Sequence, residues 1–225
     1  MAEYKLINTE KWPRYEHFRK FYDEVSCAAS LCDDIDVTEL KNSCHDCGRS
    51  FYISMLYAVT AVVNAHDEFR LTAVDSPEYP ALMPAVWDRV DPVHNVFHED
   101  SETYTTIVTP WNEDYSTFCE YAEEDIARGR KLTIAAIPTG DNVFEVSCVP
   151  WRHFTSVGVG CDTYPLSPVV VWGRIIERDG RIMLPLSIQI NHAAADGFHL
   201  ARFINEVEEK ARVLSDYIRQ MKGRD

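Results

Sequence analysis

The sequence predicts one mixed α/β domain over residues 1–225, with helices packed on a mixed β-sheet. Segments with apolar residues at helical spacing alternate irregularly with strand-like apolar runs. This order, together with a hairpin signal in the second half, favours a mixed sheet over a doubly wound parallel one. The chain has no Gly/Ser-rich linker and no internal repeat, which favours a single compact domain.

Four segments carry the helical spacing. The first begins at Pro13, a residue suited to the first position of a helix. Tyr15, Phe18 and Phe21 recur through it at that spacing. We expect helices over residues 13–24, 37–64, 115–128 and 197–221.

Six runs are typical of strands. They cover residues 85–90, 93–98, 103–108, 143–149, 169–177 and 181–190. The last two are joined at Asp179-Gly180, which is a strong hairpin signal. Pro185 has no N–H to donate, so it predicts a bulge or an edge position within the last strand.

Charge and composition exclude several classes of protein. The formal charge is 22 − 36 = −14, which argues against a nucleic-acid-binding protein. No apolar run reaches the roughly 20 residues of a membrane span, and the beginning of the chain lacks the features of a secretory signal. Seven cysteines without a framework spacing then indicate reduced thiols in the cytoplasm.

The most informative motif is His192-Ala-Ala-Ala-Asp196-Gly197, between the last strand and the last helix. A His at the end of a strand is held rigidly and can reach a cleft. Three small residues allow close approach of a ligand, and Asp196 can accept hydrogen bonds at the start of the helix. By itself, the motif fits an ordinary strand-to-helix corner about as well as a functional site.

Two further blocks, far from the motif, extend the pattern. One is Trp12-Pro-Arg14-Tyr-Glu-His17-Phe18, and the other is Ser147-Cys-Val-Pro150-Trp151 followed by Phe154-Thr-Ser156. With the His192 block, they resemble, in order, three blocks of the trimeric, His-dependent chloramphenicol acetyltransferase family. The resemblance runs from Trp12 to about Glu209.

The resemblance implies transfer of an acetyl group from acetyl-CoA to a hydroxyl of chloramphenicol or a similar small acceptor. His192 would be the general base, because imidazole titrates near neutral pH. Asp196 would pair with Arg14 and lock the loop that carries His192. Ser147 would donate to the oxyanion that forms on the thioester carbon.

The same resemblance implies the binding residues and the assembly. Trp151 would lie near the acetyl-CoA tunnel, and the acceptor pocket would be lined by Phe21, Cys27, Tyr104 and Val159. The family assembles as a homotrimer with its sites at subunit boundaries, requires no metal and confers antibiotic resistance. We therefore expect a cytoplasmic enzyme that binds neither nucleic acid nor membrane.

Two positions and two segments depart from the family pattern. Asn191 replaces the first of two adjacent His residues, and Val171 replaces a Thr that helps to bind a transition-state water. The segment 159–167 is shortened and 76–85 is an added loop. These changes leave two alternatives: an H-x-x-x-D-G acyltransferase with a different small acceptor, including the dihydrolipoyl enzymes, and a non-catalytic CoA- or ligand-binding homologue.

One cysteine cluster resembles half of a zinc site. Cys44-His45-Asp46-Cys47 has suitable spacing, but no second Cys/His pair follows it. Because the cluster falls within a predicted helix, we expect no structural zinc. Cys148 follows Ser147 in a strand, so it is expected on the opposite face, packed in the core.

Overall fold

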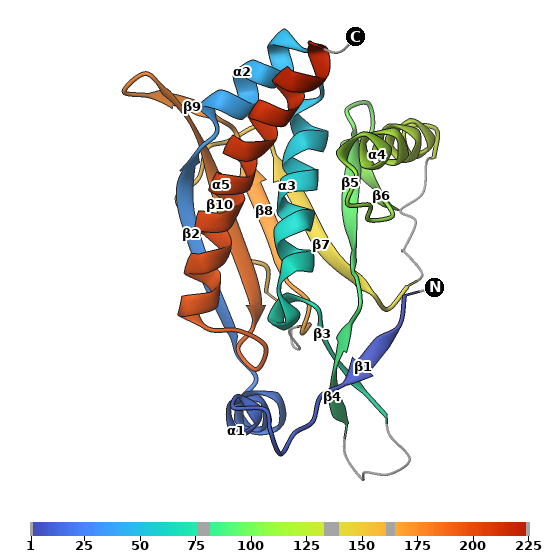
Figure 1. The fold of residues 1–225 in the computed structure, drawn as a ribbon, viewed down its shortest axis with the longest axis vertical. Helices are drawn as coiled ribbons and strands as arrows, with labels where there is room; N and C mark the ends of the chain where they lie inside the picture. Colours follow the sequence, from blue (N-terminus) through green and yellow to red (C-terminus); the bar gives the residue numbers. More distant parts are fainter. Residues whose placement is uncertain (1, 76–81, 133–139, 161–164, 224–225) are drawn as a thin grey trace.

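The computed structural model describes residues 2–75, 82–132, 140–160 and 165–223. Its main sheet has the strand order β2-β10-β8-β7-β5-β6, and β9 pairs with β10 (Figure 1). Strand β7 is parallel to β5 and β8, whereas the other pairs are antiparallel. The predicted mixed sheet is therefore confirmed. The strands are β2 (Ala28–Asp36), β5 (Asp91–His98), β6 (Thr103–Val108), β7 (Val143–Val149), β8 (Val169–Gly173), β9 (Ile176–Arg178) and β10 (Arg181–Asn191).

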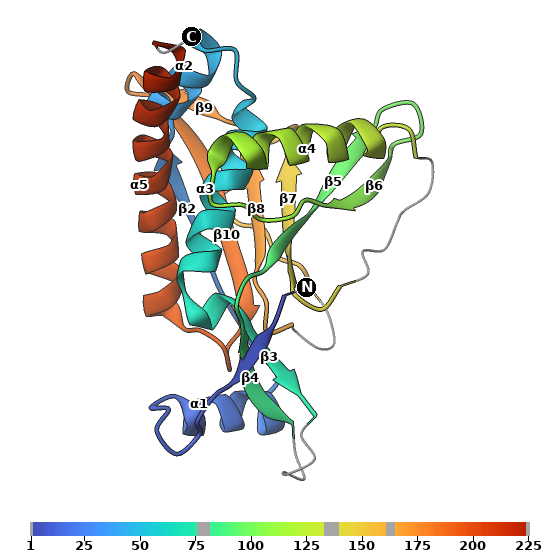
Figure 2. The same ribbon diagram turned by 45° about the vertical axis from the view of Figure 1, so that its right-hand side comes forward.

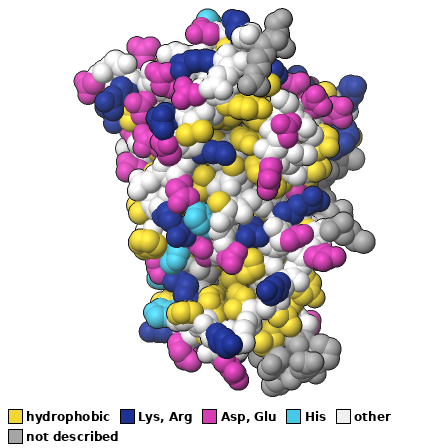
Figure 3. Space-filling view, in the orientation of Figure 1, with side chains coloured by type: hydrophobic (Ala, Val, Ile, Leu, Met, Phe, Trp, Pro, Cys, Tyr) yellow, Lys and Arg dark blue, Asp and Glu magenta, His cyan; other side chains and the backbone are white. Residues whose placement is uncertain are grey.

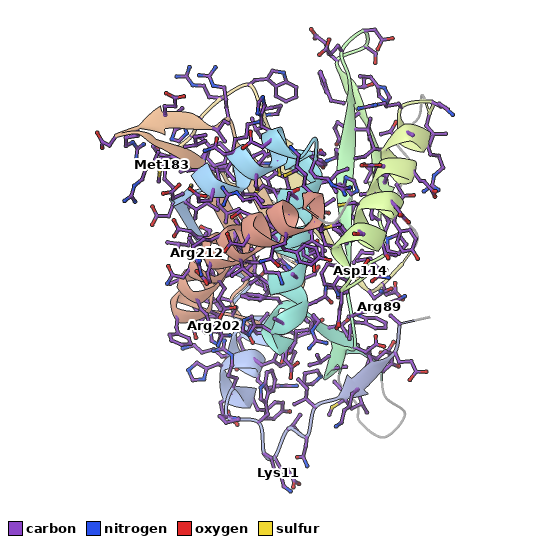
Figure 4. The ribbon with its side chains drawn as sticks, turned by 45° about the horizontal axis from the view of Figure 1, so that its top comes forward. Lys11, Arg89, Asp114, Met183, Arg202 and Arg212 are labelled. Atoms are coloured by element: carbon purple, nitrogen blue, oxygen red, sulfur yellow. The ribbon has the colours of Figure 1, made fainter. Side chains whose placement is uncertain are left out.

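Helices cover one face of this sheet. Figures 1 and 2 show α2 (Thr38–Asp46), α3 (Phe51–Ala65) and α5 (Gly197–Lys222) together on that face. Helix α4 (Tyr115–Gly129) lies beside β5 and β6. Asp114, labelled in Figure 4, begins α4 by accepting a hydrogen bond from the Thr117 N–H at 2.9 Å.

A smaller layer lies at the end of the molecule where β10 ends. Helix α1 (Tyr15–Arg19) continues into a π-helical turn, Lys20–Glu24. A three-stranded sheet has the order β1 (Tyr4–Leu6), β4 (Met83–Trp87) and β3 (Leu71–Val74). In Figures 1 and 2 both features lie at this end, opposite the C-terminus of α5.

The core forms between the main sheet and α3 and α5. Its largest fully buried side chains are Phe18, Phe69, Phe118, Phe144, Phe203, Ile35, Leu40, Met55, Leu56, Leu184, Leu186 and Ile188. On the outer face of this layer, Lys and Arg side chains are mixed with Asp and Glu, with hydrophobic groups between them (Figure 3). Among the described residues, no helix combines the length and hydropathy that a membrane span requires.

The predicted helix 37–64 is two helices. Gly48 adopts φ +64°, a left-handed conformation that ends α2. Ser50 then begins α3, because its Oγ accepts a hydrogen bond from the Ile53 N–H at 3.3 Å. The continuous apolar spacing concealed this break.

Strand β2 was not predicted. Among the described strands, it lies at the edge of the main sheet and pairs with β10 alone. Its second half carries Asp33, Asp34 and Asp36, residues that strands disfavour. Because an edge strand can carry charge on its exposed side, the apolar pattern that marks inner strands is missing here.

Pro185 lies in an inner strand and not at an edge. It faces Asp34 of β2 on one side. On its other side β9 pairs with Arg181–Met183 and β8 with Leu186–Gln189, so Pro185 falls in the gap between them. The missing N–H therefore interrupts no ladder. A Cβ on Gly173 would approach Pro185 Cγ to 2.8 Å, so only glycine fits where β8 ends.

The predicted hairpin is confirmed. Asp179 and Gly180 adopt φ of 51° and 74°, as a two-residue type I′ turn requires, and Arg178 pairs with Arg181 across it. The predicted strand 169–177 is interrupted, however, and becomes β8 and β9. Most of the added loop 76–85 and part of the shortened segment 159–167 lie outside the described residues.

A histidine is buried in this fold. His94 of β5 is fully inaccessible, and its burial lowers its pKa to about 4. The unfolded chain takes up a proton at this residue near pH 6.5, whereas the folded chain does not until about pH 4. The free energy of unfolding therefore falls as the pH falls through this window.

We expect His94→Phe to flatten the dependence of stability on pH. Between pH 7 and pH 5, the wild type should lose about 2 kcal/mol more of its free energy of unfolding than the variant. Urea unfolding at both pH values measures the difference. His45→Phe is the matched control for replacing a histidine by a phenylalanine, because its side chain is 86% exposed and folding does not bury it. Equal losses in wild type and His94→Phe would contradict the expectation.

Candidate active site

The turn after β10 holds His192 between the sheet and α5. Asn191 forms this turn: its Oδ1 accepts from the Ala193 N–H at 2.9 Å, and its carbonyl oxygen accepts from the Ala194 N–H at 2.9 Å. Ala193, Ala194 and Ala195 are fully buried. Larger side chains would not fit here, which explains the run of three alanines.

Two neighbours fix His192. Its backbone N–H donates to the Cys27 carbonyl at 2.9 Å, and its ring stacks on Phe21 with centroids 4.1 Å apart and planes inclined by 4°. Its Nδ1 is buried and has no hydrogen-bond partner among the described residues. Nε2 is therefore the ring nitrogen available for proton transfer.

Asp196 links α5 to α1. Arg14 Nη1 donates to Asp196 Oδ2 at 2.7 Å, so the predicted ion pair is present. Asp196 also begins α5, because its Oδ1 accepts from the Phe198 N–H at 3.1 Å and lies 2.9 Å from His199 Nδ1. Burial by itself would raise the pKa of Asp196, but the hydrogen bonds from Arg14 and His199 outweigh it and hold this pKa at about 2.

A second ion pair secures the same end of α5. Arg202, labelled in Figure 4, pairs with Glu68 and lies over the Phe198 ring, 5.5 Å from its centroid. Glu68 belongs to the short helix Asp67–Phe69 after α3. The beginning of α5 is thus held from two sides. Sequence reasoning missed Arg202, Glu68 and His199; only the His three residues after the capping Asp196 left a local signal.

Val159 lies close to the same strand. The Gln189 side chain donates to the Val159 carbonyl at 2.6 Å and accepts from its N–H at 3.3 Å. Gln189 is three residues before His192 in the sequence. One chain therefore gathers His192, Phe21, Cys27, Val159 and the Arg14–Asp196 pair at the end of β10.

Ser147 lies elsewhere in the chain. It pairs with Val171 of β8, which pairs with Ser187 of β10. Trp172 is buried in the core, and Cys148 packs against the core on the face opposite Ser147, as predicted, but is only partly buried. Ser147 and Val171 therefore face away from α3 and α5. Two strands across and five residues along the sheet separate the backbones of Ser147 and His192 by roughly 19 Å.

Trp151 and Tyr104 form a third group near Ser147. Trp151 packs edge-on against Phe97 with centroids 4.7 Å apart, and Phe97 pairs with Tyr104 across β5 and β6. Trp151 and Tyr104 are more than half exposed. Trp151 also lines a mainly apolar cavity of about 440 Å³ with Phe51, Tyr52, Asn95, Phe97, Cys148, Pro150, Trp172, Gly173, Arg174, Ile175 and Leu184.

The cysteine cluster is not assembled into a metal site. Cys44 is buried in α2 and lies 3.3 Å from Ser54 Oγ, whereas the His45 side chain faces solvent. Within the part of the chain that the structure describes, no three His, Cys, Asp or Glu side chains are grouped to hold a metal.

Two solved structures of acyltransferases share this fold. One chloramphenicol acetyltransferase superimposes with a TM-score of 0.76 and 26% identity, covering 93% of this chain and 98% of that chain. A probable dihydrolipoamide acetyltransferase from Listeria monocytogenes has a TM-score of 0.57 at 16% identity, covering 91% of this chain and 92% of that chain, and shows the shared fold. The architecture is that of an acyltransferase.

Proteins with similar sequences show which family of acyltransferases the chain belongs to. The family model for chloramphenicol acetyltransferase matches residues 2–208. The chloramphenicol acetyltransferase of Streptomyces acrimycini is 37% identical, covering 90% of this chain and 91% of its own. Chloramphenicol acetyltransferase 3 of Escherichia coli is 33% identical, covering 92% of this chain and 96% of its own. The chain belongs to the chloramphenicol acetyltransferase family, and it is an acyltransferase.

We expect removal of Arg14 to raise the pKa of Asp196, because Arg14 stabilises its ionised carboxyl. In Arg14→Met the Asp196 pKa should rise from about 2 toward 3.8, as followed by carboxyl ¹³C NMR. The stability from this pair is present above about pH 4 and is lost as the pH falls toward 2. At pH 7 the variant should lose about 1 kcal/mol of free energy of unfolding, since the pair is partly exposed.

The matched control is Arg19→Met. Arg19 forms an exposed i,i+4 pair with Asp23 on the same short helix, and its loss should leave the Asp196 resonance unchanged. An Asp196 pKa that stays near 2 in Arg14→Met would show that Arg14 does not hold it down.

Proposed function

We propose that the enzyme transfers the acetyl group of acetyl-CoA to a hydroxyl of chloramphenicol, with His192 as the general base. The observation that carries the proposal is the fixed His192 ring, stacked on Phe21, with Nδ1 buried and Nε2 left for the acceptor hydroxyl. Nε2 would take the hydroxyl proton while the oxygen attacks the thioester carbon, and would then return a proton to the departing CoA sulfur.

Asp196 and Arg14 are assigned a positioning role in this proposal. Asp196 is engaged by Arg14 and by His199 and has its carboxyl held in the ionised form, so it is a poor proton acceptor. The pair instead joins α1 to the start of α5. The π-helical turn that follows α1 contains Phe21. The ring beneath His192 and the turn that carries His192 are thereby held together.

Ser147 is the proposed donor to the oxyanion. Because roughly 19 Å separates it from His192 within one chain, one chain by itself would not bring the two together. A trimer in which the His192 end of one copy meets the Ser147 and Tyr104 face of the next would complete the site. The exposed aromatic rings at that face, Phe97, Tyr104 and Trp151, favour such a contact.

The cavity beside Trp151 is the proposed entry of acetyl-CoA. Its lining is mostly apolar and aromatic, which suits the slender pantetheine arm, and Arg174 adds a cation at its wall. We place the enzyme in the cytoplasm, where acetyl-CoA is available, and expect it to confer resistance on its host.

A different hydroxyl acceptor is the second candidate. Val171, next to Ser147 in the sheet, is nearly fully buried and has no hydroxyl to hold a water at the oxyanion. A changed environment beside Ser147 favours an acceptor whose own groups compensate. Product formation from a panel of small apolar alcohols, measured beside chloramphenicol, separates the two candidates.

The first test is acetylation of chloramphenicol by the purified protein and acetyl-CoA, with the product detected by mass spectrometry. The wild type should form acetylated product, and His192→Ala should lower kcat by about 10²–10⁴-fold because the base is lost. His17→Ala is the control: it removes a His that no proposed step uses. Product formed equally well by His192→Ala would exclude the general-base role.

The second test asks whether two copies share each site. His192→Ala and Ser147→Ala trimers should each be nearly inactive, the latter by about 10²–10³-fold in kcat. After unfolding and joint refolding at equal amounts, about a quarter of the interfaces should regain both residues, with activity to match. Mixing His192→Ala with His192→Gln restores nothing and is the control. If the first mixture also stays inactive, the site is not shared.

A further inference from the structure

A chain of buried polar groups lies behind the Trp151 cavity. Tyr52, at the beginning of α3, lines the cavity, and its hydroxyl lies 3.0 Å from His94 Nδ1. His94 Nε2 lies 2.9 Å from Thr109 Oγ1, just beyond β6. His94 and Thr109 are fully buried. Three separate segments of the chain thus converge on one hydrogen-bonded line.

The line continues to Asp125 of α4. Asp125 is almost fully buried, and its Oδ1 accepts from Arg128 Nη2 at 2.5 Å. Its Oδ2 is buried and has no other hydrogen-bond partner among the described residues. Burial raises the pKa of Asp125, while contact with the Thr109 hydroxyl and with Arg128 opposes that rise. The Thr109 hydroxyl is thus the nearby donor for this carboxylate.

The Asp125 carboxylate determines which group donates and which accepts in each hydrogen bond of the line. A carboxylate paired with Arg128 only accepts, so the Thr109 hydroxyl hydrogen is expected to turn toward Asp125, and the Thr109 oxygen then accepts from His94 Nε2–H. A neutral imidazole that donates through Nε2 accepts through Nδ1, so the Tyr52 hydroxyl donates to His94. Burial keeps His94 neutral at physiological pH. The Tyr52 oxygen is then left with acceptor capacity only.

We propose that His94, Thr109 and Asp125 are positioning residues that fix the Tyr52 phenol with its hydrogen turned away from the cavity. The cavity wall then offers an acceptor and selects a ligand that donates an amide N–H, as the pantetheine arm of acetyl-CoA does. The inference rests on the proposed function, since it takes the Trp151 cavity as the site of the coenzyme.

The energetic cost of burying His94, Thr109 and Asp125, and their location behind the cavity, both support a role other than packing. A His, a Thr and an Asp in the interior of a domain are expensive to bury unless each finds its partner. An apolar residue at position 94 would fill the space without any need for Thr109 or Asp125. The structure instead places all three in a line with Tyr52, which lines the cavity.

The test is a double-mutant cycle between His94 and Tyr52. The readouts are the Kd of CoA by calorimetry and the KM of acetyl-CoA. Tyr52→Phe and His94→Phe should each raise both constants by about three- to tenfold, and leave kcat and the KM of the acceptor within about twofold. If His94 acts through Tyr52, adding His94→Phe to Tyr52→Phe changes nothing further. Additive losses, or an unchanged Kd in His94→Phe, would overturn the proposal.

Conservative variants keep the test decisive if His94→Phe folds poorly. Thr109→Val removes the hydroxyl with little change of volume and should raise the Kd of CoA as His94→Phe does. Thr105→Val is its matched control: Thr105 is equally buried on β6, but its hydroxyl lies 2.8 Å from His98 Nε2 and has no link to Tyr52. If Thr109→Val and Thr105→Val change the Kd of CoA equally, the hydrogen bonds of Thr109 do not position Tyr52, and the proposal is overturned.

Trp151→Ala separates this inference from the proposed function. If it leaves the Kd of CoA unchanged, the cavity is not the coenzyme site, and the proposed entry of acetyl-CoA fails together with the inference. If Trp151→Ala weakens CoA but His94→Phe and Thr109→Val do not, the coenzyme site stands and only the inference is overturned.

Discussion

The ion pair between Arg14 and Asp196 is the contact on which the His192 end of the molecule depends. It joins residues 182 positions apart in the sequence and closes the first helix onto the last. Because Asp196 also begins α5, one carboxylate sets the entry of that helix and the position of α1. The stacking of Phe21 on His192 follows from this placement. Protonation of Asp196 would weaken both its pairing with Arg14 and its contacts at the start of α5. The contacts from Arg14 and His199 keep its carboxyl ionised.

The sheet keeps apart His192 and Ser147, the two residues to which the proposed function assigns the chemistry. His192 stands at one end of β10, whereas Ser147 lies two strands away and farther along, on the face that α3 and α5 leave uncovered. His192 and Ser147 are separated both along the strand direction and across two neighbouring strands. Within one sheet, these two side chains therefore cannot come into contact. The proposed trimer would bring His192 of one copy beside Ser147 of the next.

Much of this could be predicted from the sequence, and the failures have physical causes. The hairpin was predicted because Asp-Gly is a local turn signal, and the mixed sheet because helical and strand-like segments alternate irregularly. The Arg14–Asp196 pair was predicted only through the resemblance to the chloramphenicol acetyltransferase family. The break at Gly48 was missed because apolar spacing runs through it. Strand β2 was missed because an edge strand tolerates aspartates. The line from Tyr52 to Asp125 left no local signal, since its members are distant in sequence and meet only through tertiary packing.

Gly173 has a consequence for the evolution of ligand size. A Cβ at this position would lie 2.8 Å from the Arg152 carbonyl oxygen and 2.8 Å from the Phe154 ring, and the first of these is backbone that cannot rotate away. Gly173 also belongs to the wall of the Trp151 cavity. A side chain at position 173 therefore cannot be used to make the cavity smaller, and the size of the cavity can be changed only through its other lining residues, such as Phe51, Phe97 and Trp151.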